Sequence, residues 1–292
     1  MMKIPVQHLR ELLEQDCCHV MPCCYDALTA KMIEQAGFPL TFMSGFAVSA
    51  ARLGLPDTGL ISYGELLDQG RDICTAVKVP VIGDGDTGFG NALNVRRTVE
   101  GYARAGFAAV MIEDQVSPKR CGHTKGKRVV DRNEACERIQ AAVDVRKQGL
   151  DILILARTDA RATHDLKEAI ARANAFAAIG ADILFVEAPQ SVEEMTAICR
   201  KAPGIHMANI IEGGKTPVLP PQDLYAMGFK IAAYPLVLLS AAMKAVADAL
   251  EDLKTGSYPT SIMDFETVRR RIGFDEYYKM EERYAASSRT DD

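Results

Sequence analysis

Acidic side chains follow several apolar segments of the 292-residue chain, and they are its best candidates for chemistry. Asp84 and Asp86 end one such segment, Glu113 ends the next, and Asp57 lies in a Gly-Leu-Pro-Asp sequence. Carboxylates gathered at one place repel one another unless a cation or protons offset their charge. Oxygen ligands without a nearby histidine favour Mg²⁺, or Mn²⁺, over zinc. We therefore predict a Mg²⁺ site from these four residues, one or two of which touch the ion. The alternative is that they cap helices or lie solvated in loops.

A basic, glycine-containing segment at residues 117–128 contains the most reactive cluster in the sequence. Its centre reads Lys119-Arg120-Cys121-Gly122-His123. Neighbouring positive charge lowers the pKa of a thiol and suits Cys121 to proton transfer, with His123 as a second catalytic candidate. The same charge would attract an anionic substrate. We predict a lid over the site, with an ordinary surface loop as the alternative.

Other apolar segments also end in polar residues. Arg157 can bind a carboxylate through two hydrogen bonds. Glu187 would act as an acid or base or orient Arg157, although a structural ion pair is the alternative. Asn209, followed by Glu-Gly-Gly-Lys-Thr at 212–216, offers donors to a second anionic group, and Ser44-Gly45 could hold a carboxylate.

The segments that carry these residues are short and continuously apolar, as is typical of strands buried on both faces. We predict strands at 19–22, 40–44, 80–84, 108–113, 152–157, 182–187, 205–209 and 231–234. Helix signals lie between them. Capping boxes begin at Ser62 and Ser191, Asp165 caps a helix that ends at Gly180, and Asn94 opens a helix that ends at Gly106.

Eight strand–helix units in a chain slightly longer than about 250 residues predict an α/β fold of the (β/α)8 barrel class. A doubly wound open sheet is the alternative. Functional residues of a barrel lie at the carboxyl ends of its strands, which is where the polar residues above fall. No Pro/Gly/Ser-rich linker divides the chain, so we expect one domain over 1–292. Residues 245–292 would be a helical extension of it, with apolar residues in 265–284 packed on the barrel or on a neighbouring subunit.

The composition excludes several other classes of protein. The chain is 48% apolar and 25% charged with a net charge of −5, which is ordinary globular composition and argues against a binder of nucleic-acid phosphates. No apolar run approaches the roughly 18 residues that cross a membrane. The N-terminus lacks a secretory pattern, so we expect a cytoplasmic protein.

Two motif matches are rejected. Eight cysteines are too dilute for a disulfide framework, and the adjacent pairs Cys17-Cys18 and Cys23-Cys24 chelate a single zinc poorly, so we expect reduced thiols. The sequence from Gly83 to Gly88 matches a dinucleotide fingerprint. However, both residues that flank Gly85 are aspartates, which would repel a pyrophosphate.

These residues together resemble the isocitrate lyase / phosphoenolpyruvate mutase superfamily. The motifs that carry the resemblance are Tyr25-Asp26-Ala27-Leu28, Ser44-Gly45, Gly54-Leu55-Pro56-Asp57, Asp84-Gly85-Asp86-Thr87-Gly88, Glu113-Asp114-Gln115, Lys119-Arg120-Cys121-Gly122-His123, Ala156-Arg157-Thr158-Asp159-Ala160, and Asn209 with 212–217. The resemblance implies a barrel that binds a 2-oxo acid or enolate on Mg²⁺, in a homotetramer of two helix-swapped dimers. The implied substrate-binding residues are Ser44, Gly45, Phe46, Asp84, Lys119, Arg120, Gly122, Arg157 and Asn209.

The resemblance favours the carbon–carbon lyase branch, whose loop cysteine is an acid/base. Such an enzyme cleaves a 2-hydroxy dicarboxylate to a 2-oxo acid and a carboxylate through an enediolate. Carboxyphosphonoenolpyruvate mutases keep a similar loop, and oxaloacetate hydrolases use the same metal, so both remain alternatives, as does a non-catalytic anion-binding barrel. Phe46 stands where 2-methylisocitrate lyases have glycine, which favours substituted malates, as in 2,3-dimethylmalate lyases and petal death proteins, over tricarboxylates.

Overall fold

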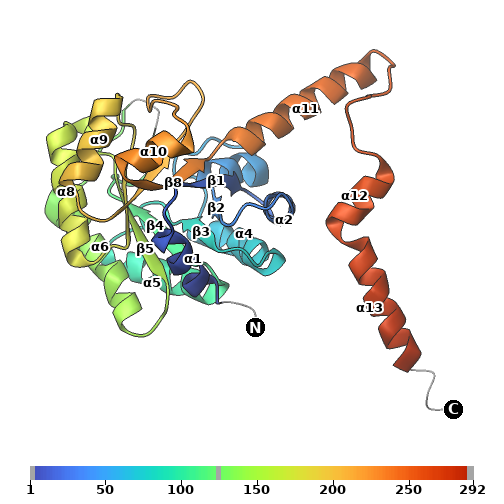
Figure 1. Ribbon diagram of the computed structural model, residues 1–292, viewed down its shortest axis with the longest axis horizontal. Coiled ribbons are helices and arrows are strands. Elements are labelled where there is room, and N and C mark those ends of the chain that lie inside the picture. The colour runs from blue at the N-terminus through green and yellow to red at the C-terminus, as the bar shows by residue number, and fades with distance from the viewer. Residues whose placement is uncertain (1–3, 123–125, 288–292) are drawn as a thin grey trace. The chain divides into compact units, whose positions relative to one another are not determined.

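Eight parallel strands close into a barrel in sequence order (Figure 1). The structure, a computed structural model, describes residues 4–122 and 126–287. The strands are β1 (His19–Cys24), β2 (Thr41–Met43), β3 (Val81–Asp84), β4 (Ala109–Glu113), β5 (Leu153–Thr158), β6 (Ile183–Val186), β7 (Ile205–Asn209) and β8 (Phe229–Tyr234). The first strand pairs with the last, with His19 opposite Ile231, so the sheet has no edge. This closure confirms the predicted (β/α)8 barrel and excludes the open sheet.

One helix, α1 (Pro5–Glu14), precedes the first strand, and the others connect the strands along the outside of the barrel (Figure 1). The connecting helices are α2 (Ala27–Gln35), α3 (Gly45–Val48), the π-helical turn η1 (Ser49–Leu53), α4 (Tyr63–Ala76), α5 (Ala92–Ala105), α6 (Arg132–Lys147), α7 (Ala160–Thr163), α8 (Leu166–Ile179), α9 (Val192–Lys201) and α10 (Pro221–Met227).

The helix caps agree with the sequence at most of the predicted positions. Ser62 forms a full capping box at α4, and Asp165 caps α8, which ends at Gly180 in the left-handed conformation. Ser191 caps α9, but the Glu194 carboxylate accepts from the backbone N–H of Gln190 instead of completing a box. One prediction was wrong by three residues. Asn91, not Asn94, is the N-cap of α5, and Asn94 completes its capping box from the third helical position. Both asparagines can accept backbone N–H groups, so residue type alone does not distinguish them.

Alternate residues along the strands pack into an interior apolar cluster and into outer clusters against the helices. Ile82 and Met111 point into the barrel, whereas their neighbours Val81 and Val110 pack against the surrounding helices. This alternation is the period-two geometry of a strand covered on both faces. Leu9 and Leu12 of α1 belong to the interior cluster, so this helix extends the barrel core. The interior is therefore filled below the carboxyl ends of the strands, and a site can form only above that filling.

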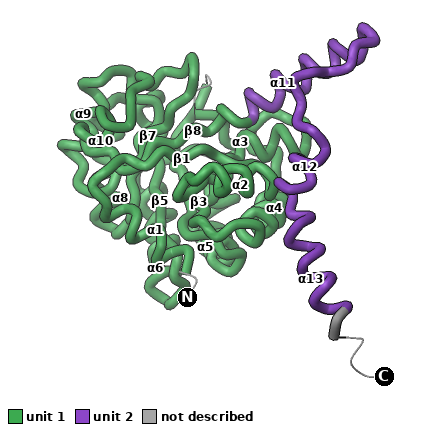
Figure 2. Tube along the Cα trace, turned by 45° about the vertical axis from the view of Figure 1, so that its right-hand side comes forward, with its two compact units in different colours: residues 1–238 green, residues 239–292 purple. Residues whose placement is uncertain are grey.

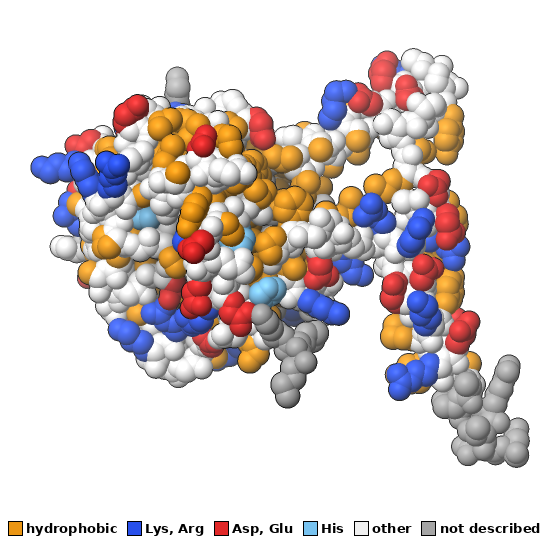
Figure 3. All heavy atoms as spheres, viewed as in Figure 1, with side chains coloured by type: hydrophobic (Ala, Val, Ile, Leu, Met, Phe, Trp, Pro, Cys, Tyr) orange, Lys and Arg blue, Asp and Glu red, His pale blue; other side chains and the backbone are white. Residues whose placement is uncertain are grey.

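The chain divides into two compact units, residues 1–238 and 239–292 (Figure 2). The second unit contains most of α11 (Val237–Lys254), and all of α12 (Phe265–Ile272) and α13 (Phe274–Ser287). Its helices expose many apolar side chains (Figure 3), namely Met243, Val246, Leu250, Leu253, Phe265, Ile272, Tyr277, Met280 and Tyr284. The single domain over 1–292 and the helix swap stay predictions. Across residues 4–122 and 126–287, no helix is long and apolar enough to cross a bilayer.

Candidate functional site

The carboxyl ends of the strands surround a cavity that most of the predicted site residues line. Those residues are Ser44, Phe46, Asp57, Asp84, Lys119, Cys121, Gly122, Arg157, Glu187 and Asn209. They come from six different strand–helix loops or strand ends. The rest of the wall is largely apolar and includes Phe42, Met111, Phe185, Met207 and Leu236. Side chains that are far apart in the sequence therefore meet at the end of the barrel that the strand pattern predicted.

The other predicted residues lie behind this wall or away from it. Gly45, Asp86 and Glu113 are buried directly behind lining residues. Arg120 has an exposed side chain that does not line the cavity, so the structure does not bring it to the predicted substrate site. His123 lies outside the described residues, and its predicted role stays a prediction.

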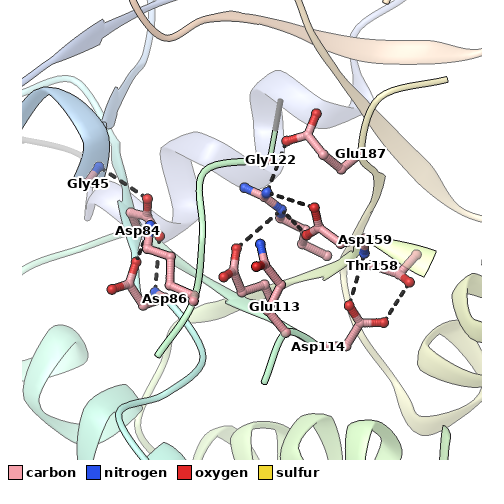
Figure 4. Close-up of polar contacts among 12 residues, drawn as sticks. Gly45, Asp84, Asp86, Glu113, Asp114, Gly122, Thr158, Asp159 and Glu187 are labelled. Carbon is pink, nitrogen blue, oxygen red and sulfur yellow. Dashed lines mark hydrogen bonds and ion pairs between the residues drawn. The ribbon is translucent and has the colours of Figure 1, made fainter. Parts of the chain in front are cut away.

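Three aspartates surround one lysine at the ends of β2 and β3, and we call Asp57, Asp84, Asp86 and Lys119 the acidic cluster. Lys119 Nζ lies 2.6 Å from Asp57 Oδ1 and 3.0 Å from Asp86 Oδ1. Asp84 Oδ2 accepts from the backbone N–H of Gly45 at 3.1 Å, and Asp84 Oδ1 accepts from that of Asp86 at 3.0 Å (Figure 4). All four side chains are buried. The three carboxylates thus share a single ammonium group.

Two glycines allow the chain to approach the acidic cluster closely, and one aspartate of the cluster has a strained backbone conformation. A Cβ on Gly85 would lie 2.6 Å from the carbonyl oxygen of Met111, and one on Gly45 would lie 2.6 Å from Asp84 Oδ2. Asp86 itself has a φ of 47°, in the left-handed region that costs energy for most residues. The glycines therefore permit close chain approach beside the aspartates, which is the interpretation that the sequence favoured over a dinucleotide fingerprint.

Burial acts strongly on the ionisation of the acidic cluster. It raises the pKa of the Asp86 carboxyl to about 7, although the Lys119 ammonium opposes this shift. Burial alone would lower the pKa of Lys119, but the surrounding carboxylates of Asp86 and Asp84 raise it well above its ordinary value. Lys119 is therefore charged, and Asp86 is the carboxyl beside it whose ionisation burial opposes.

Three buried oxygens in and beside this cluster are suited to a hard cation. Asp57 Oδ1 and Asp86 Oδ1 lie in ion-pair contact with Lys119 but form no aligned hydrogen bond with it, and Glu113 Oε1 has no aligned donor among the described residues. In the same part of the chain, no three side chains of His, Cys, Asp or Glu already stand in a metal-ligand arrangement. Mg²⁺ keeps several waters and needs only one or two carboxylate ligands. A site with few carboxylate ligands therefore suits Mg²⁺ better than an ion that needs a complete set of protein ligands.

A second cluster surrounds Arg157 at the end of β5, and we call Arg157, Glu113, Asp159 and Glu187 the arginine cluster. Figure 4 labels its three carboxylates. Arg157 Nε lies 3.3 Å from Glu113 Oε2 and donates to Asp159 Oδ2 at 2.8 Å. Arg157 Nη2 lies 3.1 Å from Glu187 Oε2. The half-buried Asn209 donates to Glu187 Oε2 at 3.3 Å. Burial raises the pKa of Glu113 well above its usual range, with Arg157 opposing the shift.

Asp114 supports the arginine cluster from below. Its carboxylate accepts from Thr158 Oγ1 at 2.6 Å and from the backbone N–H of Asp159 at 2.9 Å (Figure 4). Arg172 of α8 donates to the same carboxylate at 3.0 Å. These contacts fix the backbone that carries Asp159, and Asp159 in turn fixes the guanidinium of Arg157.

The cysteine loop (residues 117–122 and 126–128) runs across both clusters. Lys119 enters the acidic cluster, and Gly122 lies against the arginine cluster two residues after Arg120. A Cβ on Gly122 would be 2.5 Å from both Arg157 Nη2 and Glu187 Oε2, so only glycine allows this approach. Gln115 holds the loop by bonding the backbone N–H and carbonyl of Arg120 at 3.0 and 2.9 Å. Cys121 is half-buried and faces the cavity between the clusters.

Sequence reasoning missed two polar contributors and most of the apolar wall. The sequence shows Asp159 only as a member of the motif at 156–160 and Lys127 only as one of the basic residues at 117–128. Lys127 Nζ in fact donates to Asp159 Oδ1 at 2.6 Å. A buried acid directly after a strand could have indicated Asp159. The partner of Lys127 depends on loop conformation, for which a sequence gives no periodic signal.

Comparisons with known proteins agree with this geometry. Residues 9–254 match the family described as phosphoenolpyruvate phosphomutase. The chain is 42% identical over 281 residues to 2,3-dimethylmalate lyase of Eubacterium barkeri, covering 95% of this chain and 97% of the relative. It is 40% identical to the chloroplastic carboxyvinyl-carboxyphosphonate phosphorylmutase of Arabidopsis thaliana, covering 94% and 83%. The solved structure of an oxaloacetate acetylhydrolase with the inhibitor 3,3-difluorooxalacetate aligns with a TM-score of 0.92 at 33% identity, covering 97% of each chain. The similarity to a named lyase supports the predicted enzyme class.

Proposed function

The chain belongs to the phosphoenolpyruvate phosphomutase family, and on that premise we propose that it is a Mg²⁺-dependent carbon–carbon lyase. Its substrate is a 2-hydroxy dicarboxylate of the 2-alkylmalate type. The products are a 2-oxo acid and a second carboxylate, which is released as an enediolate and then protonated. One observation carries this proposal. A cysteine faces the same cavity as an acidic cluster, an arginine and an amide.

The metal is expected among Asp84, Asp86, Asp57 and Glu113. The last three each have a buried carboxylate oxygen without an aligned hydrogen-bond donor among the described residues, which suits a hard cation. When bound, Mg²⁺ would favour ionisation of the substrate's 2-hydroxyl and withdraw charge from its neighbouring carboxylate.

The chain's own residues account for the other requirements of the reaction. Arg157 presents a guanidinium to the cavity, held in one orientation by Asp159, and suits one substrate carboxylate. Asn209 and Glu187 face the second fragment. The substrate's 2-hydroxyl gives its proton to solvent and its oxygen becomes the 2-oxo group. The electron pair of the C2–C3 bond that breaks passes to the second fragment as an enediolate. The Cys121 thiol then donates its proton to the enediolate carbon, and the resulting thiolate takes a proton from solvent.

The apolar wall supports a dicarboxylate as the substrate. Lys119 and Arg157 are the cationic side chains among the described lining residues, and both already pair with carboxylates. A third substrate carboxylate would face Phe46 and its apolar neighbours and would lose hydration without a counter-charge. An alkyl group in that position would instead gain from burial. This favours 2,3-dimethylmalate over 2-methylisocitrate.

The test is a substrate panel with purified enzyme and Mg²⁺. The panel contains 2,3-dimethylmalate, 2-methylisocitrate, oxaloacetate and phosphonopyruvate, and the products are identified by NMR. We expect pyruvate and propanoate from 2,3-dimethylmalate, and no reaction once a chelator has removed the metal. Oxalate with acetate would identify a hydrolase, and phosphoenolpyruvate would identify a mutase. Either result as the main activity would overturn the lyase assignment.

We also propose that the enzyme is a cytoplasmic homotetramer built from helix-swapped dimers. The apolar side chains exposed along α11, α12 and α13 support a partner subunit, because an extended apolar surface is typical of an interface that is buried in an assembly. Analytical ultracentrifugation tests the assembly. A chain that stays monomeric at micromolar concentration would contradict it.

A further inference from the structure

Lys127 is a buried cation outside the machinery described above, and it bonds to two different parts of the site. Its Nζ donates to Asp159 Oδ1 at 2.6 Å and also to the backbone carbonyl of Gly122. The Lys127 side chain is only 2% exposed and that of Asp159 is fully buried. An ammonium loses several kcal/mol of hydration on burial unless a counter-charge and hydrogen bonds replace the water. Asp159 and the Gly122 carbonyl supply both, so the position of Lys127 is well determined.

Asp159 shares its carboxylate between Lys127 and the arginine cluster. Oδ1 also accepts from Arg157 Nη2 at 3.2 Å, while Oδ2 accepts from Arg157 Nε at 2.8 Å. The Asp159 backbone N–H is held by Asp114. Lys127 thus binds the part of the site that is anchored most rigidly to the barrel.

The other contact of Lys127 determines where the cysteine loop lies. Gly122 packs so closely on Arg157 and Glu187 that a single added carbon would overlap both. Gly122, which carries this carbonyl, is the residue directly after Cys121 in the chain. Holding this carbonyl therefore fixes the distance of the thiol from the guanidinium that would bind substrate.

We propose that Lys127 is a positioning residue that fixes the Cys121–Gly122 backbone over Arg157 through the Gly122 carbonyl and Asp159. The effect of Lys127 on catalysis rests on the proposed function, in which Cys121 is the proton donor. The effect of Lys127 on the position of Cys121 is independent of the proposed function. Lys127 contacts no reacting atom, and its influence is on the geometry of the proton transfer.

The test compares Lys127→Met and Lys127→Gln with Lys147→Met, a control at an exposed position in the last turn of α6. Asp159 keeps Arg157 as a partner in both test variants, so we expect them to fold, as checked by melting temperature. A displacement of about 1 Å can cost about 100-fold in rate. We expect kcat with 2,3-dimethylmalate to fall by about that factor with KM nearly unchanged.

A second readout does not depend on turnover. Alkylation by iodoacetamide, followed residue by residue with mass spectrometry, reports how accessible each thiol is. Cys121 should be alkylated faster in both Lys127 variants than in the wild type and in Lys147→Met. Cys17, which precedes β1 at the opposite end of the barrel, serves as the internal reference and should react at one rate throughout.

The two proposals fail in different ways. A wild-type enzyme that cleaves no member of the panel overturns the proposed function, whereas faster alkylation of Cys121 in the Lys127 variants still supports the positioning role. An alkylation rate at Cys121 that equals the wild-type rate in both variants overturns the positioning role, whatever happens to turnover.

Discussion

The two charged clusters at the mouth of the barrel differ in how completely their charges are paired. In the acidic cluster, three carboxylates share the ammonium of Lys119, which leaves a formal charge of −2. In the arginine cluster, three carboxylates meet Arg157 and also Lys127, which leaves −1. Buried charge is stable only when paired or bound to a metal. The comparison therefore favours the acidic cluster as the place of the proposed Mg²⁺ and an orienting role for the arginine cluster.

Glu113 marks the boundary between the two clusters. Its Oε2 pairs with Arg157, whereas its Oε1 has no aligned donor among the described residues. The cysteine loop crosses the same boundary, because Lys119 lies in one cluster and Gly122 against the other. Cys121 is thus the residue that can act on a molecule bound to both clusters at once, and its loss should have the largest effect.

Cys121→Ser should lower turnover of the preferred substrate by about 10²- to 10⁴-fold, the usual contribution of a positioned acid or base. A hydroxyl is a much weaker acid than a thiol, so the enediolate would not be protonated at a useful rate. The measurement is steady-state kinetics, with Cys17→Ser as the matched control. Mg²⁺ and oxalate binding should persist in calorimetry. Near-normal turnover would remove the cysteine from the mechanism.

Asp86→Asn should weaken Mg²⁺ binding by about 100-fold, towards the upper end for changes around a metal site. The substitution keeps the size of the side chain but removes one of the charges that leave the acidic cluster short of a cation. Isothermal titration of the substrate-free protein with Mg²⁺ measures this.

The matched control for that titration is Asn209→Ala beside the arginine cluster, which should leave Mg²⁺ affinity unchanged. If both variants lose the metal equally, the clusters are not functionally distinct and the contrast drawn between them is wrong.

Phe46→Gly should shift the preference between substrates by about tenfold towards 2-methylisocitrate, within the range that small changes in pocket shape produce. Phe46 lines the same cavity as both clusters but carries no charge, so its removal should change shape and hydration alone. The ratio of kcat/KM values for 2-methylisocitrate and 2,3-dimethylmalate is the measurement. An unchanged ratio would show that Phe46 does not select the substrate.

Strand order and the position of the site could be predicted because both follow from a local pattern. Polar residues such as Asp84 and Arg157 end apolar strands, and parallel strands bring their carboxyl ends together. The exact strand ends depend on pairing instead. β1 extends to Cys24 because Cys23 and Cys24 pair with β2, and β8 begins early because Phe229 pairs with His206.

Loop conformation could not be predicted, and the main departures from expectation fall there. The basic residues of the cysteine loop share a charge and a segment, yet Lys119 enters the acidic cluster while Arg120 faces outward. Lys127 pairs with Asp159, 32 residues further along. No repeat of 2 or 3.6 residues governs such turns. Pairing with the buried carboxylates determines which basic side chain of the loop lies in the site.

His206 provides the smallest test of how this barrel treats buried charge, because it lies outside both clusters and is kept neutral. Its Nε2 donates to the Ala202 carbonyl at 2.8 Å, Nδ1 has no aligned partner among the described residues, and burial lowers its pKa below the usual 6.5. The unfolded chain therefore takes up a proton at a higher pH than the folded protein does. The stability contribution of the neutral histidine is complete above the unfolded pKa and declines as the pH falls from there towards the lowered folded value.

Urea unfolding of the wild type at about pH 7.5 and about pH 5.5 should thus give a smaller free energy of unfolding at the lower pH. His206→Gln should remove the part of this difference that the histidine causes. His164→Gln, at an exposed position, is the control and should leave the difference unchanged. Equal pH dependence in the wild type and His206→Gln would mean that the carboxylates of the two clusters, and not the histidine, control the acid sensitivity of the fold.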